Sequence, residues 1–196
     1  MRRFWAVLAG GAVAGGVWYV FHRSTTSEDG DTVRHLGKKV PEEHVVTRLR
    51  ILTCNDVYEI VNLPRVKTAF DALRLAPNQG TTVATLPGDF LAPSLLSSID
   101  SGKGMVDLMN KCGFDYVSFG NHENDIPYDQ LLHRIKQSRF QWLNTNMKAL
   151  PLPEDLADRC PDHCLLEVSG PGDSTRKVGL IGLLTEDKNL YRPGKQ

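Results

Sequence analysis

Cysteine is scarce in this sequence. The 196 residues contain four cysteines, Cys54, Cys112, Cys160 and Cys164. They are too few and too widely spaced for a disulfide framework, which excludes the small disulfide-stapled secreted domains. We expect Cys54 and Cys112 to be buried thiols, because they fall in a predicted strand and a predicted helix. Cys160, His163 and Cys164 form only a weak metal-binding signal, and a loop disulfide or free thiols are favoured there.

The sequence also lacks an excess of charge of either sign. Lys and Arg together number 23 and so do Asp and Glu, which gives a formal net charge of +0. There is thus no electrostatic case for a nucleic-acid partner, which a basic chain would present. No Asn-x-Ser/Thr sequon occurs, so glycosylation gives no support for a luminal location. Length and an ordinary apolar content indicate a single globular domain.

Only one long hydrophobic run is present, at residues 4–21, between Met1-Arg2-Arg3 and His22-Arg23. It has about the 18 residues that a transmembrane helix requires. Aromatic residues near both of its ends are typical of membrane interfaces. A cleaved signal peptide is the first alternative, but the bulky residues 17–21 argue against cleavage there. A mitochondrial presequence is the second, but the run is apolar on all sides rather than amphipathic.

We therefore predict an uncleaved, single-pass membrane anchor at residues 1–23, which makes the membrane a partner. Residues 24–47 are polar, contain Gly30, Gly37 and Pro41, and show no periodic apolar face. They are predicted to form a flexible linker between the anchor and a domain at residues 48–196.

In that domain, predicted strands alternate with predicted helices, which indicates an α/β fold. The loop at 90–98 is a candidate cover for a site. The expected strands are 49–53, 82–86, 116–119 and 140–143, then a hairpin of 164–168 and 177–183; the expected helices are 64–76, 105–112 and 128–139.

Polar residues follow three of the predicted strands directly. Asn55-Asp56 follows the first strand, Gly88-Asp89 follows the second, and Gly120-Asn121-His122-Glu123 follows the third. Each group taken alone is an ordinary turn sequence, since Asp, Asn and Gly favour turns. Open α/β sheets bind ligands at the carboxyl ends of their strands. The ordered set therefore predicts a carboxylate-rich metal centre for Mn, Zn, Fe or Mg.

These three motifs resemble those of the calcineurin-like metallophosphoesterases, and most closely the 5′-nucleotidase branch. The third motif of that branch, G-N-H-E-x-D, is matched by Gly120 through Asp125. The resemblance covers the chain from Leu49 onward. It implies a four-layer α/β/β/α sandwich, of which this chain would hold about the first half.

The resemblance also implies roles for individual residues. Asp89 would bridge two divalent metal ions, Asp56 would bind the first and Asn121 the second. His122, oriented by Asp125, would protonate the leaving group. The substrate would be a nucleoside 5′-monophosphate or another phosphate ester. Two metal ions about 3.5–4 Å apart can generate hydroxide and stabilise both oxygens of the displacement.

The sequence departs from the family pattern in two places. Tyr58 stands where the first motif, D-x-H, has a metal-ligating His, and we do not count it as a ligand. After His122 the chain has only His133 and His163, and neither lies in the family's later G-H-x-H motif. These departures favour an alternative, a membrane-tethered binding or scaffold module without catalysis. They also predict little hydrolysis by this chain alone.

Overall fold

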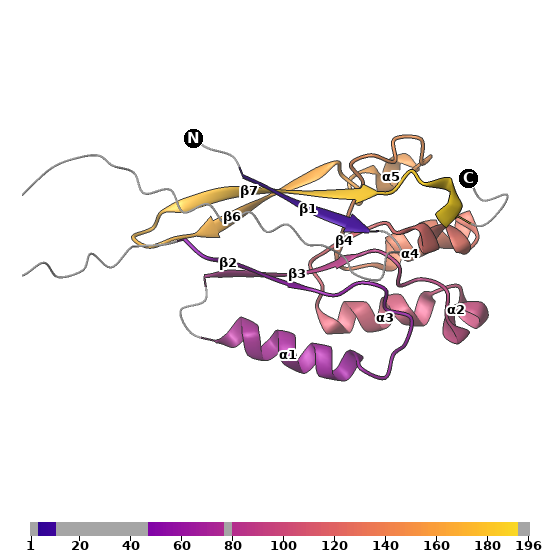
Figure 1. The fold of residues 1–196 in the computed structure, drawn as a ribbon, viewed down its shortest axis with the longest axis horizontal. Helices are drawn as coiled ribbons and strands as arrows, with labels where there is room; N and C mark the ends of the chain where they lie inside the picture. Colours follow the sequence, from indigo (N-terminus) through magenta and orange to yellow (C-terminus); the bar gives the residue numbers. More distant parts are fainter. Residues whose placement is uncertain (1–3, 11–46, 77–79, 192–196) are drawn as a thin grey trace, which may run out of the picture.

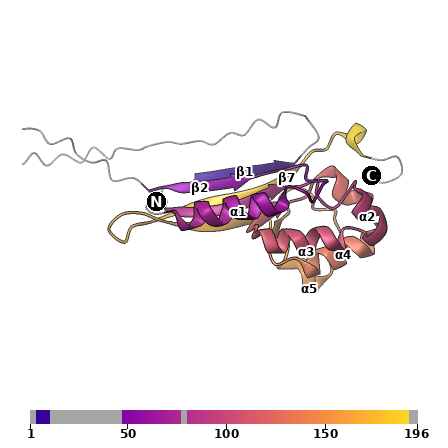
Figure 2. The ribbon, with the colours of Figure 1, turned by 90° about the horizontal axis from the view of Figure 1, so that it is seen from below.

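A computed structural model describes residues 4–10, 47–76 and 80–191. The described residues form two sheets and a layer of helices (Figure 1). Helices α1 (Leu63–Leu75) and α3 (Lys103–Cys112) cover the face of the larger sheet that is turned away from the smaller one (Figures 1 and 2). This is an α/β/β arrangement of three layers, and the predicted α/β class is confirmed.

The larger sheet has four strands in the order β2-β3-β4-β5, and each neighbouring pair is parallel. Helix α1 follows β2, α3 follows β3 and α4 (Tyr128–Gln137) follows β4, as the alternation in the sequence predicts. Parallel strands joined in this way bring all their carboxyl ends to one edge. The strands are β2 (Leu49–Thr53), β3 (Thr81–Pro87), β4 (Tyr116–Ser118) and β5 (Gln141–Leu143).

The smaller sheet contains the predicted hairpin, in which β6 (His163–Ser169) and β7 (Thr175–Leu184) are antiparallel. Alternate residues of β6 are buried, as expected for a strand with one face on a core. That core lies between the two sheets and is aliphatic. Its buried residues are Val83, Leu143, Leu166, Val168 and Leu180.

Strand β1 (Phe4–Gly10) pairs in parallel with β7 at the edge of the smaller sheet. The predicted transmembrane helix is therefore wrong for these residues. The backbone N–H and C=O groups of an apolar segment can be hydrogen-bonded in a helix or along the open edge of a sheet, and here β7 provides such an edge. Of the predicted anchor and linker, residues 1–3 and 11–46 lie outside the described part of the chain. In the part that is described, no helix is long and apolar enough to cross a bilayer.

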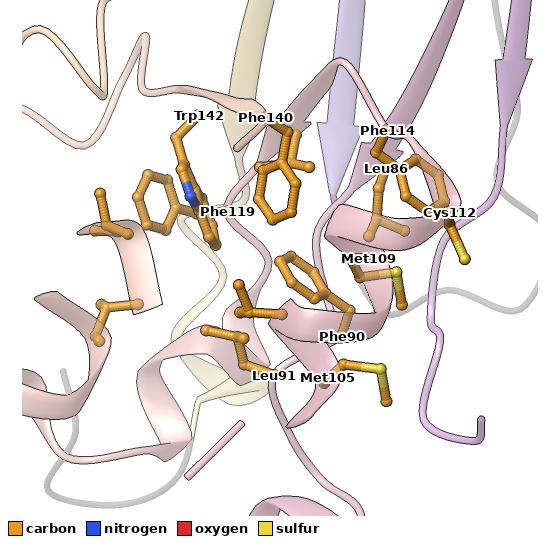
Figure 3. Packing of buried hydrophobic residues seen from close by; sticks show 14 of the residues in the cluster. Leu86, Phe90, Leu91, Met105, Met109, Cys112, Phe114, Phe119, Phe140 and Trp142 are labelled. Carbon is orange, nitrogen blue, oxygen red and sulfur yellow. The ribbon is translucent and has the colours of Figure 1, made fainter. Parts of the chain in front are cut away.

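The loop after Asp89 begins by turning into the protein. Phe90 and Leu91 are fully buried, and Phe90 stacks on Trp142 with ring centroids 5.5 Å apart (Figure 3). Trp142 also packs against Phe119, with centroids 4.6 Å apart. The segments that flank the predicted site residues are thus anchored in the aromatic core between the larger sheet and the helices.

Helix α2 (Leu95–Asp100) follows that loop and has no counterpart among the expected elements. The Ser94 hydroxyl accepts from the backbone N–H of Ser97, and the Ser97 hydroxyl accepts from that of Ser94. This is a capping box in which Ser replaces the usual Glu or Gln at the third helical position, so the sequence signal is weak. Short helices α5 (Glu154–Ala157) and η2 (Lys188–Leu190) also lie outside the expected helices.

Candidate metal centre

The carboxyl ends of β2, β3 and β4 bring the predicted residues together. The backbone N–H of Val57, beside Asp56, donates to the Asp89 carbonyl oxygen at 3.0 Å. The backbone N–H of His122 donates to Asp89 Oδ1 at 2.9 Å. A Cβ atom on Gly120 would lie 2.2 Å from the same carboxylate oxygen, so this close approach requires glycine. Asp89 is therefore in contact with both of the other two strand-end motifs.

Asp56 and Asp89 share an uncommon backbone conformation. Their φ angles are +53° and +58°, in the left-handed region that few residues other than glycine adopt. Asp adopts it more readily than most residues, because its short polar side chain can hydrogen-bond locally. Left-handed residues outside glycine concentrate at functional sites. The ends of β2 and β3 thus each present a carboxylate from a residue in the left-handed backbone conformation.

Glu123 connects two of the three site loops. Its side chain is 1% exposed and accepts hydrogen bonds from four backbone N–H groups. Oε2 accepts from Asp89 at 2.8 Å and from Gly120 at 2.7 Å, while Oε1 accepts from Phe90 at 2.9 Å and from Leu91 at 3.1 Å. Sequence patterns alone assign Glu123 no role. Its only signal is its place in the Gly120–Asp125 motif.

The site concentrates negative charge around Asp89, whose side chain is 2% exposed. Burial and the nearby Glu123 carboxylate raise the pKa of Asp89 from 3.8 to about 7. The Asp56 carboxylate acts in the same direction, and the hydrogen bond from His122 opposes the shift. A buried carboxylate whose ionised form is disfavoured by its neighbours is a candidate ligand for a cation.

His122 and Asp125 form the predicted pair. The Nδ1 atom of His122 lies 2.8 Å from Asp125 Oδ2. The Asp125 side chain is 5% exposed and that of His122 is 26% exposed, so the carboxylate is covered while the imidazole reaches solvent. Both residues lie in η1 (Asn121–Asp125), a short 3-10 turn directly after β4. The carboxylate can therefore fix the tautomer and orientation of the ring.

Asn121 is buried and its amide is only half satisfied. Its Nδ2 donates to the Leu190 carbonyl oxygen at 2.8 Å, whereas its Oδ1 is buried and has no hydrogen-bond partner among the described residues. Leu190 ends η2, which follows β7, so the segment after the smaller sheet orients this side chain. An unpaired buried acceptor is costly unless something binds to it. The sequence does not predict the contact with Leu190, which joins positions far apart in the chain.

These donors fit a hard divalent cation. Two carboxylates and an amide oxygen are the ligand types that Mg, Mn and related ions prefer. Across residues 4–10, 47–76 and 80–191, however, no three His, Cys, Asp or Glu side chains gather as a metal-binding group. Asn121 would have to supply the amide oxygen beside Asp56 and Asp89.

The other candidates from the sequence lie elsewhere. His133 is exposed on α4, and His163 is exposed at the start of β6. All four cysteines are free thiols. Burial raises the pKa of Cys54 to about 11 and that of Cys160 to about 12. Within the described residues, Cys160, His163 and Cys164 do not gather as a metal-binding group, and of the two expected states, a loop disulfide or free thiols, the structure has the free thiols.

Known proteins resemble this chain in sequence or in fold. No family model matches the chain. The NAD 5′-nucleotidase of Haemophilus influenzae is 25% identical over 182 residues, which are 82% of this chain and 29% of that protein. The crystal structure of a 5′-nucleotidase precursor from Thermus thermophilus has a TM-score of 0.60 and 22% identity, and the match covers 74% of this chain and 30% of that one.

A calcineurin-like phosphoesterase from Bacillus subtilis has a TM-score of 0.51 and 19% identity, over 70% of this chain and 48% of that one. These two solved structures share the fold of the described part of this chain. The resemblance to 5′-nucleotidases and calcineurin-like phosphoesterases is thus confirmed, and the chain spans about 30% of the length of the 5′-nucleotidases that it matches.

The raised pKa of Asp89 predicts how stability depends on pH without metal. Between pH 4 and pH 7 the folded chain keeps a proton that the unfolded chain has released, so stability falls progressively over this range and levels off once the pH exceeds 7. Asp89→Asn cannot ionise. In urea unfolding with EDTA, it should stabilise the protein at pH 8 by on the order of 2 kcal/mol, and much less at pH 5.

Asp158→Asn is the matched control, since Asp158 is exposed after α5. It should leave the free energy of unfolding unchanged at both pH values. An Asp89→Asn effect of the same size at pH 5 and pH 8 would contradict the assigned ionisation.

Replacing Glu123 should weaken the hydrogen bonds that hold the Asp89 loop to the Gly120 loop. In Glu123→Gln, an amide group that cannot accept replaces one carboxylate oxygen, so backbone N–H groups of the Asp89 or Gly120 loop lose their acceptor. We expect the free energy of unfolding to fall by about 2–3 kcal/mol. Urea unfolding at pH 5 is the measurement, because Asp89 is then mostly protonated and relief of its repulsion contributes little.

Glu167→Gln provides the comparison, because Glu167 is exposed on β6 and forms a surface ion pair with Lys177. Such pairs contribute about 1 kcal/mol or less. Equal effects of the two substitutions would show that Glu123 does not hold the loops.

Proposed function

We propose that this protein hydrolyses phosphate esters with divalent metal ions bound at the carboxyl ends of β2, β3 and β4. One observation carries the proposal. Asp89, a buried carboxylate with a disfavoured negative charge, contacts the loops of Asp56 and of Asn121, and the Asn121 amide oxygen has no hydrogen-bond partner in the part of the chain that is described. The similarity to 5′-nucleotidases and to a calcineurin-like phosphoesterase supports the same reaction class.

In this proposal the three strand-end residues divide the metal ligation. Asp89 lies between Asp56 and Asn121 and would contribute to two metal positions, with Asp56 at the first and Asn121 at the second. Bound metal ions would supply the nucleophile and neutralise charge on the phosphoryl group. Glu123 and Leu190 would serve these ligands by holding the Asp89 loop and the Asn121 amide in place.

His122 would act on the leaving group. Its Nδ1 is held by Asp125, so the ring presents its other nitrogen as the proton donor to the leaving oxygen. The Asp125 carboxylate would hold the ring in the tautomer and orientation that this role requires. The side chain of His122 is 26% exposed, so a substrate can reach the ring from solvent.

For the substrate we propose a nucleoside 5′-monophosphate. The similar proteins reported above are a NAD 5′-nucleotidase and a 5′-nucleotidase precursor, and the shared term 5′-nucleotidase supports this substrate class.

The test separates metal binding from proton transfer. Phosphate release from adenosine 5′-monophosphate is measured with Mn²⁺ in the full-length protein and in His122→Ala. We expect kcat to fall by about 10²–10⁴-fold, because a positioned proton donor contributes that much. The Kd for Mn²⁺ should stay within about twofold, since His122 is not a proposed ligand.

His133→Ala is the matched control, because His133 is exposed on α4 and should change neither quantity. Equal losses of turnover and Mn²⁺ affinity in His122→Ala would contradict the assigned role. Mn²⁺ binding by the wild-type protein without hydrolysis of any phosphomonoester would favour the binding-module alternative.

A further inference from the structure

Tyr58 contacts both halves of the proposed machinery. It lies in the loop after β2, two residues beyond Asp56, and its side chain is partly buried. Its hydroxyl donates a hydrogen bond to Asp56 Oδ1 at 2.9 Å. Its ring meets the imidazole of His122 edge to face, with centroids 5.8 Å apart and planes at 88°. One side chain thus joins a proposed metal ligand to the proposed proton donor.

The hydrogen bond from Tyr58 completes a clamp on the Asp56 carboxylate. The other carboxylate oxygen, Oδ2, accepts from the side-chain amide of Asn55. Each oxygen of Asp56 therefore has one neutral donor, which uses one of its acceptor positions and leaves another for a metal ion. Because the Asp56 backbone is already held in the left-handed region, the two donors leave the side chain little freedom to rotate.

The ring of Tyr58 has a separate effect on His122. Asp125 holds one edge of the imidazole, but a hydrogen bond at a single nitrogen still allows the ring to tilt. The edge-to-face contact with Tyr58 restricts that tilt, and such aromatic pairs contribute about 0.5–1.5 kcal/mol. The hydroxyl and the ring of Tyr58 therefore act on different partners and can be removed one at a time.

We propose that Tyr58 is a positioning residue that aligns Asp56 for metal binding through its hydroxyl and aligns His122 through its ring. The inference rests on the proposed function, because it takes Asp56 as a ligand and His122 as the proton donor. It assigns the phenol a role other than ligation, because the Tyr58 hydroxyl donates its hydrogen bond to the Asp56 carboxylate, which is itself the proposed ligand. Groups that orient metal ligands in this way change metal affinity by about 10–100-fold when removed.

The experiment uses Tyr58→Phe and Tyr58→Leu in the full-length protein. Isothermal titration with Mn²⁺ gives the Kd, and the proton chemical shifts of the His122 imidazole report whether an aromatic ring lies against it. Tyr58→Phe should raise the Kd about tenfold or more and leave the His122 shifts in place. Tyr58→Leu should raise the Kd similarly and also abolish the ring-current contribution to those shifts.

Tyr128→Phe is the matched control, because Tyr128 is 43% exposed and its hydroxyl bonds only to the Pro151 carbonyl among the contacts described. It should alter neither measurement. A second readout is the double substitution with Asp56→Asn, in which Tyr58→Phe should weaken Mn²⁺ binding no further than Asp56→Asn alone.

The outcomes distinguish the two proposals. An unchanged Kd in Tyr58→Phe, or fully additive effects in the double variant, overturns the role of Tyr58 and leaves the proposed function standing. His122 shifts that are the same in Tyr58→Leu as in the wild type overturn the ring contact. A wild-type protein that binds no Mn²⁺ overturns the proposed function and the role of Tyr58 with it.

Discussion

The site depends on one buried carboxylate that is not itself a proposed ligand. The Glu123 carboxylate accepts hydrogen bonds from four backbone N–H groups in the loops after β3 and β4. These hydrogen bonds hold the loop of Asp89 against the loop of Asn121. Burying a carboxylate is costly unless it is fully hydrogen-bonded, and here the backbone supplies the bonds. The same charge lies close to Asp89 and raises its pKa. The Glu123 carboxylate therefore both holds the two loops together and adds the negative charge that a bound cation would neutralise.

The hydrophobic core makes this arrangement rigid. Phe90 and Leu91 donate their backbone N–H groups to Glu123 while their side chains are fully buried in the aromatic cluster around Trp142 (Figure 3). Moving the Asp89 loop would therefore break hydrogen bonds and withdraw two large side chains from a close-packed core. Catalytic groups held in this way are preorganised, which is where most electrostatic stabilisation in enzymes originates.

Local patterns in the sequence predict the alternating elements and the polar strand ends, because hydrophobic periodicity and turn residues are local properties. The contacts that complete the site are not local. Glu123 meets Asp89 across 34 positions, and Asn121 meets Leu190 across 69. No periodicity records such pairings. The pairing of Phe4–Gly10 with β7 is likewise not local, since composition marks a hydrophobic segment but does not say which strand it joins.

The most direct test of a metal centre at these strand ends is to locate a metal ion in crystals of the protein grown with Mn²⁺, by anomalous diffraction. We predict an anomalous peak within bonding distance of the Asp89 carboxylate and of a second strand-end ligand, either Asp56 or the amide oxygen of Asn121, which has no hydrogen-bond partner within the described part of the chain. Crystals that hold Mn²⁺ elsewhere and none at Asp89 would contradict the central claim that these strand ends form a metal centre.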